Sequence, residues 1–423
     1  MFQLRESALN KKRNEENTHI KKFIALLLAL AMVLSLAACG KKEAASAAQD
    51  NKDLYSAHLQ EDGQIEMGLE GVEVEVNVSD IHLDSFEAST SGNWEAMFTP
   101  VVVDGRAIDM ADIDLTPTAE ELEAMKNEPA YGKPLRFFMG DGCTAGTVVA
   151  EAQGFYTAAG FTATEGFKST SYTEGLGTAQ VDIAIGHIAT MLVPITNGVD
   201  LTFVGGAHIG CKSLYVLADS PYNTTEDLKG TPVSVPSGIG SSDYNITCMM
   251  LDEDDINPQT DLELIQVTAD ACINAMENGE ISAALLSDTF AYAMVKDGKL
   301  KCIRSLLDED FSTKNCCVIA MNGTYVKENP VHAKKAVQAI QKAHSFMRDK
   351  GAEATQYLLD NGWNKGDFDM NVMINNSLQF GTADKFTEDG LRDIVESYVK
   401  LGLIKNMDNV DEIMALAWSP VLD

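Results

Sequence analysis

Several familiar catalytic and membrane signatures are missing from this 423-residue chain. The G-x-S-x-G nucleophile elbow, the H-E-x-x-H zinc motif and the Walker A phosphate loop do not occur. The uncharged apolar run at residues 23–38 is shorter than the roughly 20 residues that span a bilayer. The 45% hydrophobic content is typical of folded domains and unlike collagen or disordered chains. The length allows roughly two or three domains.

Positive charge is scarce. The chain has 32 Lys and Arg against 63 Asp and Glu, a net charge of −31. Removal of residues 1–38 would take away six basic and three acidic residues and leave a net charge of −34. Such an acidic protein is not expected to bind nucleic acid or to adhere electrostatically to anionic lipid.

The eight cysteines lack the spacing of a disulfide framework or a zinc site. No C-x-x-C or Cys/His zinc pattern appears, and Cys316 and Cys317 are adjacent in an apolar run. We therefore expect buried free thiols at these two positions. One internal disulfide is the alternative. The sequence predicts no resident metal, no cofactor and no catalytic residues.

The N-terminus carries the most specific signal. Lys21 and Lys22 precede the apolar run, which ends Leu-Ala-Ala before Cys39 and Gly40. This arrangement is typical of a secretory signal and resembles the bacterial lipobox, in which the cysteine is acylated and becomes the new N-terminus. We predict a signal peptide at residues 1–38, a lipidated Cys39 and a flexible tether through residue 53, on the extracytoplasmic face of the cell membrane. An ordinary signal or anchor helix with a chance cysteine is the alternative.

Residues 54–130 are expected to form an acidic, β-rich extension packed on the main fold. They hold 18 acidic and two basic residues. Valines alternate with polar residues at 72–78, which predicts a strand with one buried face, and 101–103 predicts another before a turn. Thr118 and Glu121 form a capping-box pattern that predicts a helix running to about Lys126.

From residue 135 onwards, short apolar runs alternate with helical stretches. This pattern predicts an α/β fold with mostly parallel sheets that are covered on both faces. Expected strands are LRFFMG (135–140), VDIAIG (181–186), LTFVGG (201–206), SLYVLA (213–218), TPVSVP (231–236), LELIQV (262–267), SAALLS (282–287) and CCVIAM (316–321).

The order of these segments resembles the nitrate/sulfonate/taurine and thiamine-pyrimidine-like family of transporter binding proteins. The resemblance covers about 270 of 423 residues and is carried by VVAEAQGFYTAAGF (148–161), VDIAIGHIA (181–189), TTEDLKGTPVSVPSGIGSS (224–242), NPQTDLELIQV (257–267), NGEISAALLSD (278–288) and YVKENPVHAKKAVQAI (325–340). The chain departs from the family at Ser282, where an Asp is frequent, and at Asp288-Thr289, where Glu-Pro is frequent.

The resemblance implies a type II periplasmic-binding fold with two α/β lobes and a cleft. Lobe one would comprise 131–228 and 320–423 and lobe two 229–319, with chain crossings near 228–231 and 317–322. It further implies a monomeric solute-binding lipoprotein of an ABC importer. That protein would bind a small polar molecule or oxyanion, either sulfonate-, nitrate- or taurine-like or pyrimidine-like, and deliver it to a permease. Alternatives are an enzyme on the same fold, related to thiamine-pyrimidine biosynthesis, and a ligand sensor or adhesion module.

Four loops at strand ends are candidate ligand-binding sites, because open α/β sheets bind ligands beyond the carboxyl ends of their strands. Each loop opens a helix whose first N–H groups favour electron-rich atoms. The candidates are Gly142, Cys143 and Thr144; Gly186 and His187; Ser237, Gly238, Ile239 and Ser241; and Ser287 and Asp288.

Each candidate loop also has a purely structural interpretation. Thr144, Ser241 and Asp288 could cap helices, and His187 could be a satisfied structural histidine, with His208 a weaker candidate still. The loops contain no Arg or Lys, so an anion would depend on helix N-termini and hydroxyl groups. A Cys143/His187 nucleophile pair is conceivable but would need the two side chains in contact.

Overall fold

The computed structural model describes residues 55–59, 65–69, 106–107, 113–168 and 171–422. The chain divides into two units, Met1–Ala88 and Ser89–Asp423. In the first, β1 (Tyr55–Leu59) and β2 (Ile65–Leu69) pair as an antiparallel ladder. The predicted signal peptide, Cys39, the tether and the strands predicted at 72–78 and 101–103 lie outside the described residues.

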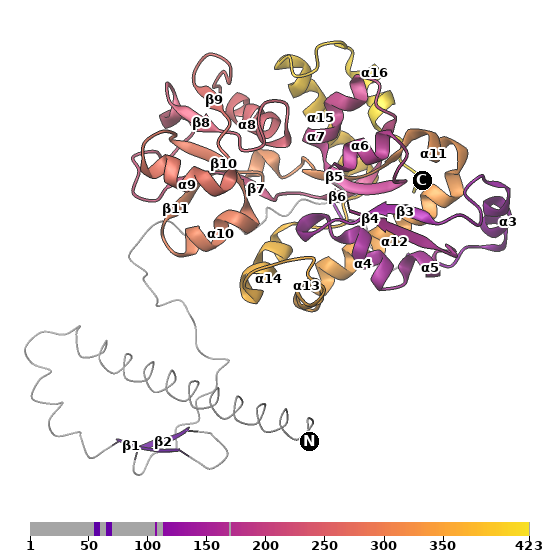
Figure 1. Ribbon diagram of the computed structural model, residues 1–423, viewed down its shortest axis with the longest axis horizontal. Coiled ribbons are helices and arrows are strands. Elements are labelled where there is room, and N and C mark those ends of the chain that lie inside the picture. Colours follow the sequence, from indigo (N-terminus) through magenta and orange to yellow (C-terminus); the bar gives the residue numbers. More distant parts are fainter. Residues whose placement is uncertain (1–54, 60–64, 70–105, 108–112, 169–170, 423) are drawn as a thin grey trace, which may run out of the picture. The chain divides into compact units, whose positions relative to one another are not determined.

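The larger unit contains two five-stranded mixed sheets (Figure 1). The first has the strand order β4-β3-β5-β12-β6, with β3 parallel to β4 and β5, and β12 antiparallel to β5 and β6. Its strands are β3 (Leu135–Phe138), β4 (Thr164–Phe167), β5 (Ile183–His187), β6 (Leu201–His208) and β12 (Cys317–Asn322).

The second sheet has the order β11-β7-β10-β8-β9. Here β8 is parallel to β9 and β10, whereas β7 is antiparallel to β10 and β11. Its strands are β7 (Lys212–Leu217), β8 (Pro232–Ser234), β9 (Glu263–Ile265), β10 (Ala283–Ser287) and β11 (Leu300–Ser305). The expectation of mostly parallel sheets is therefore only half met, because β7 and β12 run against their neighbours.

Helices cover both faces of each sheet, which explains why the strands are almost wholly apolar. On the first sheet, α6, α7, α15 and α16 lie on one side and α4, α5, α12 and α13 on the other (Figure 1). These helices are α4 (Gly146–Ala152), α5 (Phe155–Ala158), α6 (Tyr172–Gly177), α7 (Ile188–Thr196), α12 (Pro330–Asp349), α13 (Gly351–Asp360), α15 (Asp384–Lys400) and α16 (Val410–Ala417).

Alternate residues of β10 show how the second sheet is sandwiched. Ala283 and Leu285 join the core that includes helix α8 (Ser242–Glu253). Ala284 and Leu286 join a second core with helices α9 (Ala269–Glu277) and α10 (Asp288–Lys296). The strand thus has two buried faces, as its continuous apolar sequence predicts.

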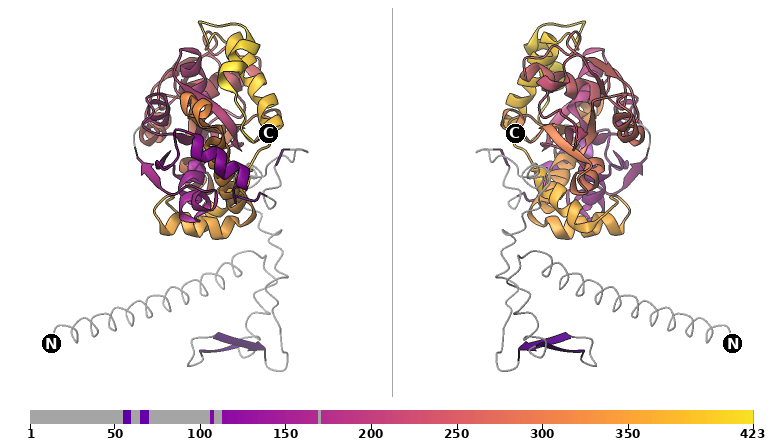
Figure 2. Two further views of the ribbon diagram at one scale, coloured as in Figure 1. Left: turned by 90° about the vertical axis from the view of Figure 1, so that its right-hand side faces the viewer. Right: turned by 90° about the vertical axis from the view of Figure 1, so that its left-hand side faces the viewer.

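The remaining helices complete the lobes. Helix α3 (Ala119–Asn127) begins with the predicted Thr118/Glu121 capping box and lies at the end of the first lobe that faces the viewer in the left panel of Figure 2. Its Glu121 pairs with Lys335 of α12, so the described end of the extension packs on the first lobe. Further helices are α11 (Gly323–Glu328), α14 (Phe368–Ser377) and the short η5 (Gly142–Thr144), η6 (Glu226–Leu228) and η7 (Glu309–Phe311).

Within the described residues, the chain passes between the two five-stranded sheets twice. The first crossing, residues 209–211, joins β6 to β7, and the second, residues 306–316, joins β11 to β12. The first crossing lies about 20 residues before the predicted position at 228–231. The expected lobe boundary at 228–229 places the strand at 213–218 in lobe one, but this strand pairs with β10 and β11 of the second sheet. An apolar strand looks the same in either lobe until its pairing partners are known.

Among the described residues, none of the helices combines the length and apolar character needed to span a bilayer.

Candidate functional site

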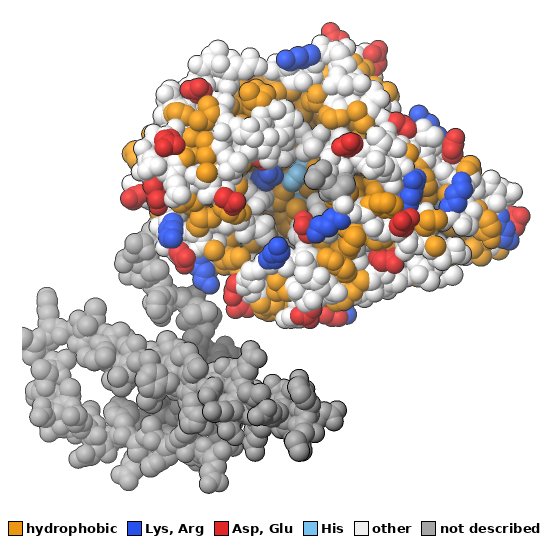
Figure 3. Space-filling model, in the orientation of Figure 1, with side chains coloured by type: hydrophobic (Ala, Val, Ile, Leu, Met, Phe, Trp, Pro, Cys, Tyr) orange, Lys and Arg blue, Asp and Glu red, His pale blue; other side chains and the backbone are white. Residues whose placement is uncertain are grey.

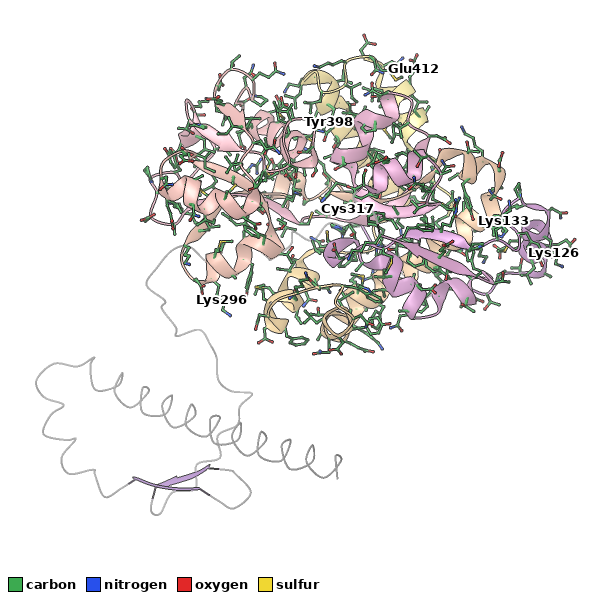
Figure 4. All side chains as sticks on the ribbon, in the orientation of Figure 1. Lys126, Lys133, Lys296, Cys317, Tyr398 and Glu412 are labelled. Carbon is green, nitrogen blue, oxygen red and sulfur yellow. The ribbon has the colours of Figure 1, made fainter. Side chains whose placement is uncertain are left out.

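The four predicted loops lie at the carboxyl ends of β3, β5, β8 and β10, two from each sheet. They meet at the chain crossings, where Figure 4 places Cys317 between the lobes. On the face shown in Figure 3, the surface is hollowed between the lobes, and a histidine and a Lys or Arg side chain are visible there. The structure thus brings strand-end loops of both sheets to one region.

The first loop is a tight turn that presents one thiol. Gly142 N–H donates to Trp363 O at 2.9 Å, which ties the turn to the segment after α13. The Thr144 hydroxyl bonds to the backbone of Asp141 and closes the turn, so it does not cap α4. Cys143 is half-buried and shares a cluster with His208 and Cys317, in which their ligand atoms lie within 4.8 Å of one another.

The second loop places His187 against two thiols. Its Nδ1 lies 3.2 Å from Cys316 Sγ and 3.4 Å from Cys317 Sγ. Its backbone N–H donates to Tyr172 Oη at 3.1 Å. Gly186 allows this approach, since a Cβ there would lie 2.3 Å from the Tyr172 ring. The thiols in contact with His187 Nδ1 are therefore those of Cys316 and Cys317. The Cys143/His187 pair considered as a nucleophile would need the Cys143 thiol in that place.

The third loop is held by its own hydrogen bonds. Ser241 caps α8, because its hydroxyl accepts from Tyr244 N and donates to Gly238 O at 2.6 Å. Gly238 has a positive φ of 87°, which glycine adopts without strain. Ile239 is 77% exposed. The capping interpretation of Ser241 is confirmed, and the Ser237 side chain and the exposed Ile239 remain as the candidate contact points.

A lysine that the sequence did not reveal lies beside the third loop. Lys212, the first residue of β7, is partly buried and forms an ion pair with the buried Asp243 in the first turn of α8. Asp243 also accepts from Ser237 N–H at 2.9 Å. The loops themselves contain no Lys or Arg, but the fold supplies a cation from a neighbouring strand.

The fourth loop is tied to the first crossing. Asp288 N–H donates to Cys211 O at 3.0 Å, and the buried Asp288 carboxylate accepts from Tyr215 Oη at 2.7 Å. Ser287 flanks the start of α10 without a side-chain cap. Asp288 is therefore a buried structural anchor at the edge of the site.

Burial acts on the pKa values of three groups at the crossings, and neighbouring groups outweigh it at two of them. Burial raises the pKa of Asp288 to about 6. Burial would also raise the pKa of Cys316, but hydrogen bonds from Cys211 and Cys317 outweigh it and lower that pKa to about 6. Burial disfavours the Lys212 ammonium, yet the Asp243 carboxylate keeps the pKa of Lys212 above its ordinary value.

Four residues at this site escaped the sequence-based prediction of binding residues: Cys211, Lys212, Cys316 and Cys317. Cys211 and Lys212 come about a hundred residues before Cys316 and Cys317 in the sequence. Only the pairing of β5, β6 and β12 brings the two pairs of residues together. All seven cysteines of the described residues are free, so the prediction of buried free thiols at Cys316 and Cys317 is confirmed. The adjacent cysteines were the one available signal.

A cavity of about 460 Å³ lies elsewhere in the first lobe, lined in part by Arg136, Asp182, Asn322 and Tyr325. Arg136 and Asp182 form an ion pair, and Asn322 donates to Leu176 O at 2.9 Å. Arg136, Asp182 and Asn322 thus already have partners within the fold. We therefore place the candidate site at the crossings, where loops of both lobes meet.

Comparisons with known proteins agree with this architecture. The family model described as "NMT1/THI5 like" matches residues 143–354. A search of curated proteins found no match.

Three solved structures illustrate the fold similarity. The alkanesulfonate-binding protein SsuA from Xanthomonas axonopodis pv. citri, bound to MOPS, has a TM-score of 0.57 at 15% identity, covering 69% of this chain and 99% of that one. The periplasmic aliphatic sulphonate binding protein SsuA from Escherichia coli has a TM-score of 0.57 at 16% identity, covering 68% and 92%. The periplasmic nitrate-binding protein NrtA from Synechocystis PCC 6803 has a TM-score of 0.51 at 14% identity, covering 67% and 85%. The chain has the fold of periplasmic binding proteins.

Proposed function

The chain belongs to the NMT1/THI5-like family, and from this premise we propose that it is an extracytoplasmic solute-binding protein that captures a small polar molecule between its lobes. The observation that carries the proposal is the convergence of strand-end loops from both sheets on the two crossings. A molecule held there touches both lobes at once. Ligand binding would then favour the closed arrangement over an open one.

The chemistry of the loops supports a ligand with electron-rich atoms. Helices α7, α8 and α10 begin at the loops, and their N-terminal N–H groups favour partial or full negative charge. Lys212 adds a cation beside the third loop, although Asp243 neutralises it. This combination suits an oxyanion or a small polar organic molecule, of the sulfonate, nitrate, taurine or pyrimidine kind.

The lobes contact each other through an apolar patch between α7 and α8, which includes Ile188 and Ile246, and through polar contacts around it. Asn245 of α8 donates to Ala189 O of α7 at 2.8 Å and is buried. Nearer the surface, Lys314 pairs with Glu253 and Lys400 with Asp252. Exposed ion pairs contribute little, so these two pairs do not by themselves hold the lobes together.

The remaining parts of the proposal concern location and partners. We propose that Cys39 is lipidated after removal of residues 1–38, which would hold a monomeric protein at the outer face of the cell membrane. The partner would be the permease of an ABC importer. Retention of the wild-type chain in the membrane fraction, and its release by Cys39→Ala, would support the anchor. Identical fractionation of both would refute it.

A thermal-shift screen tests the binding proposal directly. The full chain, purified in detergent, is heated with sulfonates, nitrate, taurine, amino acids or pyrimidines, because a ligand that binds only the folded state raises the melting temperature. A hit is then tested by small-angle scattering, in which closure reduces the radius of gyration. If a hit produces no compaction and binds equally to a variant with a blocked third loop, hinge capture is wrong.

A further inference from the structure

The hinge holds a cluster of soft metal-ligand atoms that the proposed function leaves unused. His187, Cys211, Cys316 and Cys317 place one ligand atom each within 4.8 Å of all the others. Cys211 Sγ lies 3.0 Å from Cys316 Sγ, and His187 Nδ1 lies 3.2 Å from Cys316 Sγ. Four such atoms in one small volume are what a tetrahedral site needs.

The backbone holds these four residues firmly. His187 ends β5 and Cys317 begins β12, and the two residues face each other in the β5–β12 ladder. Cys316 directly precedes Cys317, and its N–H donates to His208 O at 3.1 Å. Cys211 ends the first crossing. The site therefore joins both crossings, and two of its ligands lie on paired interior strands of the first sheet, which fixes their geometry.

A second, independent feature at the cluster also points to a ligand. His208 is fully buried, and its Nε2 has no hydrogen-bond partner among the described residues. Its Nδ1 lies 3.2 Å from Ile209 O, so the carbonyl holds the Nδ1–H tautomer and leaves the Nε2 lone pair free. His208 belongs with Cys143 and Cys317 to a second group of ligand atoms within 4.8 Å. A buried nitrogen acceptor that lacks a donor and lies beside two thiols is costly unless something binds there.

The chemical nature of the ligand set selects the ion. Thiolate and imidazole ligands favour zinc-like ions over magnesium or calcium, which prefer oxygen. Zinc–sulfur bonds of about 2.3 Å in a tetrahedron place sulfurs about 3.8 Å apart. The Cys211 and Cys316 sulfurs, at 3.0 Å, would separate by less than about 1 Å to admit the ion. Their distance is too long for a disulfide of about 2.05 Å.

We propose that His187, Cys211, Cys316 and Cys317 form a site for one zinc-class ion at the hinge, with Cys143 and His208 as a flanking pair. The half-buried side chains of His187 and Cys143 give the ion access from the hollow between the lobes. Because Cys211 and Cys316 belong to different crossings, the ion would also fasten the two crossings together. The site stands independently of which solute the cleft binds.

The first test uses the wild-type chain. The full chain is purified in detergent with a reductant, freed of metal, and titrated with Zn²⁺ and separately with Co²⁺. We expect one ion per chain and, with Co²⁺, a sulfur-to-cobalt charge-transfer band. X-ray absorption spectra of the zinc-bound protein should show three sulfur ligands at about 2.3 Å and one nitrogen ligand at about 2.0 Å. Oxygen-only coordination would show that the ion binds the acidic surface and would overturn the proposal.

The second test uses matched thiol variants. Cys316→Ser and Cys317→Ser together should weaken zinc binding at least about 100-fold and reduce the charge-transfer band, because only the Cys211 thiol of the three remains and loss of outer-shell partners alone costs 10–100-fold. Cys272→Ser is the control, because Cys272 is equally buried but lies in the second lobe's separate core. Equal affinity in the double variant and the control would refute the site. If the double variant fails to fold, the coordination numbers of the wild-type spectra decide the matter.

Redox state provides the last discriminating result. A Cys211–Cys316 disulfide that persists in reductant, detected by mass spectrometry of the intact chain, would contradict a metal site. Solute binding is measured separately on metal-free protein, so failure of the metal proposal and failure of the solute proposal give different results.

Discussion

Lys212 and the buried Asp243 form an ion pair that joins the first residue of β7 to the first turn of α8. Asp243 also accepts the Ser237 N–H. The Asp243 carboxylate therefore binds both the Lys212 ammonium and the Ser237 N–H. The third candidate loop is thus held in part by the positive charge of a lysine on a different strand. This relationship fixes the position of the loop without any ligand.

Removal of one member of the pair should be much worse than removal of both. Lys212→Met leaves the Asp243 charge buried and should lower the free energy of unfolding by about 3–5 kcal/mol. Adding Asp243→Asn keeps an acceptor for Ser237 N–H and should recover at least about half of that loss. Urea unfolding of the two variants measures the difference. Equal stability of the single and double variants would show that burial of the charge costs little here.

Enlarging Ser237 should weaken solute binding with little effect on stability. Ser237→Trp fills the space above the loop, and we expect affinity for any hit of the thermal-shift screen to fall at least about tenfold, about 1.4 kcal/mol. Thr224→Trp, on the exposed loop before β8, is the matched control. Ser241 is less suitable for this test, because its loss removes the α8 cap and costs about 1 kcal/mol of stability. Unchanged affinity in Ser237→Trp would exclude this loop from the site.

Gly186 should not tolerate even a methyl group. A Cβ at this position would lie 2.3 Å from the Tyr172 ring, so Gly186→Ala should cost about 1–3 kcal/mol through overpacking. Tyr172→Leu in the same chain removes the ring and should relieve most of the strain. Thermal unfolding of the single and double variants measures the relief. If the double variant is no more stable than Gly186→Ala alone, the clash is not the cause.

Acid should destabilise the protein partly through His344. Burial lowers the pKa of this fully buried residue to about 3, aided by nearby His208 and Arg348, against an ordinary value of about 6.5. Above pH 6.5 the imidazole is neutral in both states. Below it, only the unfolded chain takes up the proton, so stability falls, by about 2 kcal/mol between pH 6.5 and 5.

The variant His344→Gln isolates this contribution. Urea unfolding at pH 7 and pH 5 should show a smaller acid loss in the variant than in the wild type, by about 2 kcal/mol. Other groups that titrate in this range contribute equally to both proteins and cancel in the comparison. An identical loss in the two proteins would rule out His344 as the group responsible.

Much of the fold was predictable because its signals are local. Residues close together in the sequence form the apolar runs of β3, β5 and β10 and the Thr118/Glu121 capping box of α3. The placement of β7 was not predictable in the same way. Its sequence suits a buried strand in either lobe, and only antiparallel pairing with β10 and β11 assigns it to the second sheet.

The site was predictable in outline and not in its chemistry. The loops after β5 and β8 were expected because strand ends are where α/β folds bind ligands. The pairing of Lys212 with Asp243, and of His187 with Cys316, depends on residues tens to more than a hundred positions apart. No local spacing rule detects such contacts, which is why the thiols appeared to be ordinary core residues.

The whole of the second sheet, from Lys212 to Ser305, leaves the first lobe after β6 and returns at β12, and these two strands are neighbours in the first sheet. The second lobe is thus inserted into an otherwise continuous domain. Its two ends lie side by side, and domain insertions are tolerated at sites with this geometry. A short turn in its place would join β6 directly to β12 as an antiparallel hairpin. A second lobe with a different ligand specificity could replace this one between β6 and β12 without a change in the strand order of the first lobe.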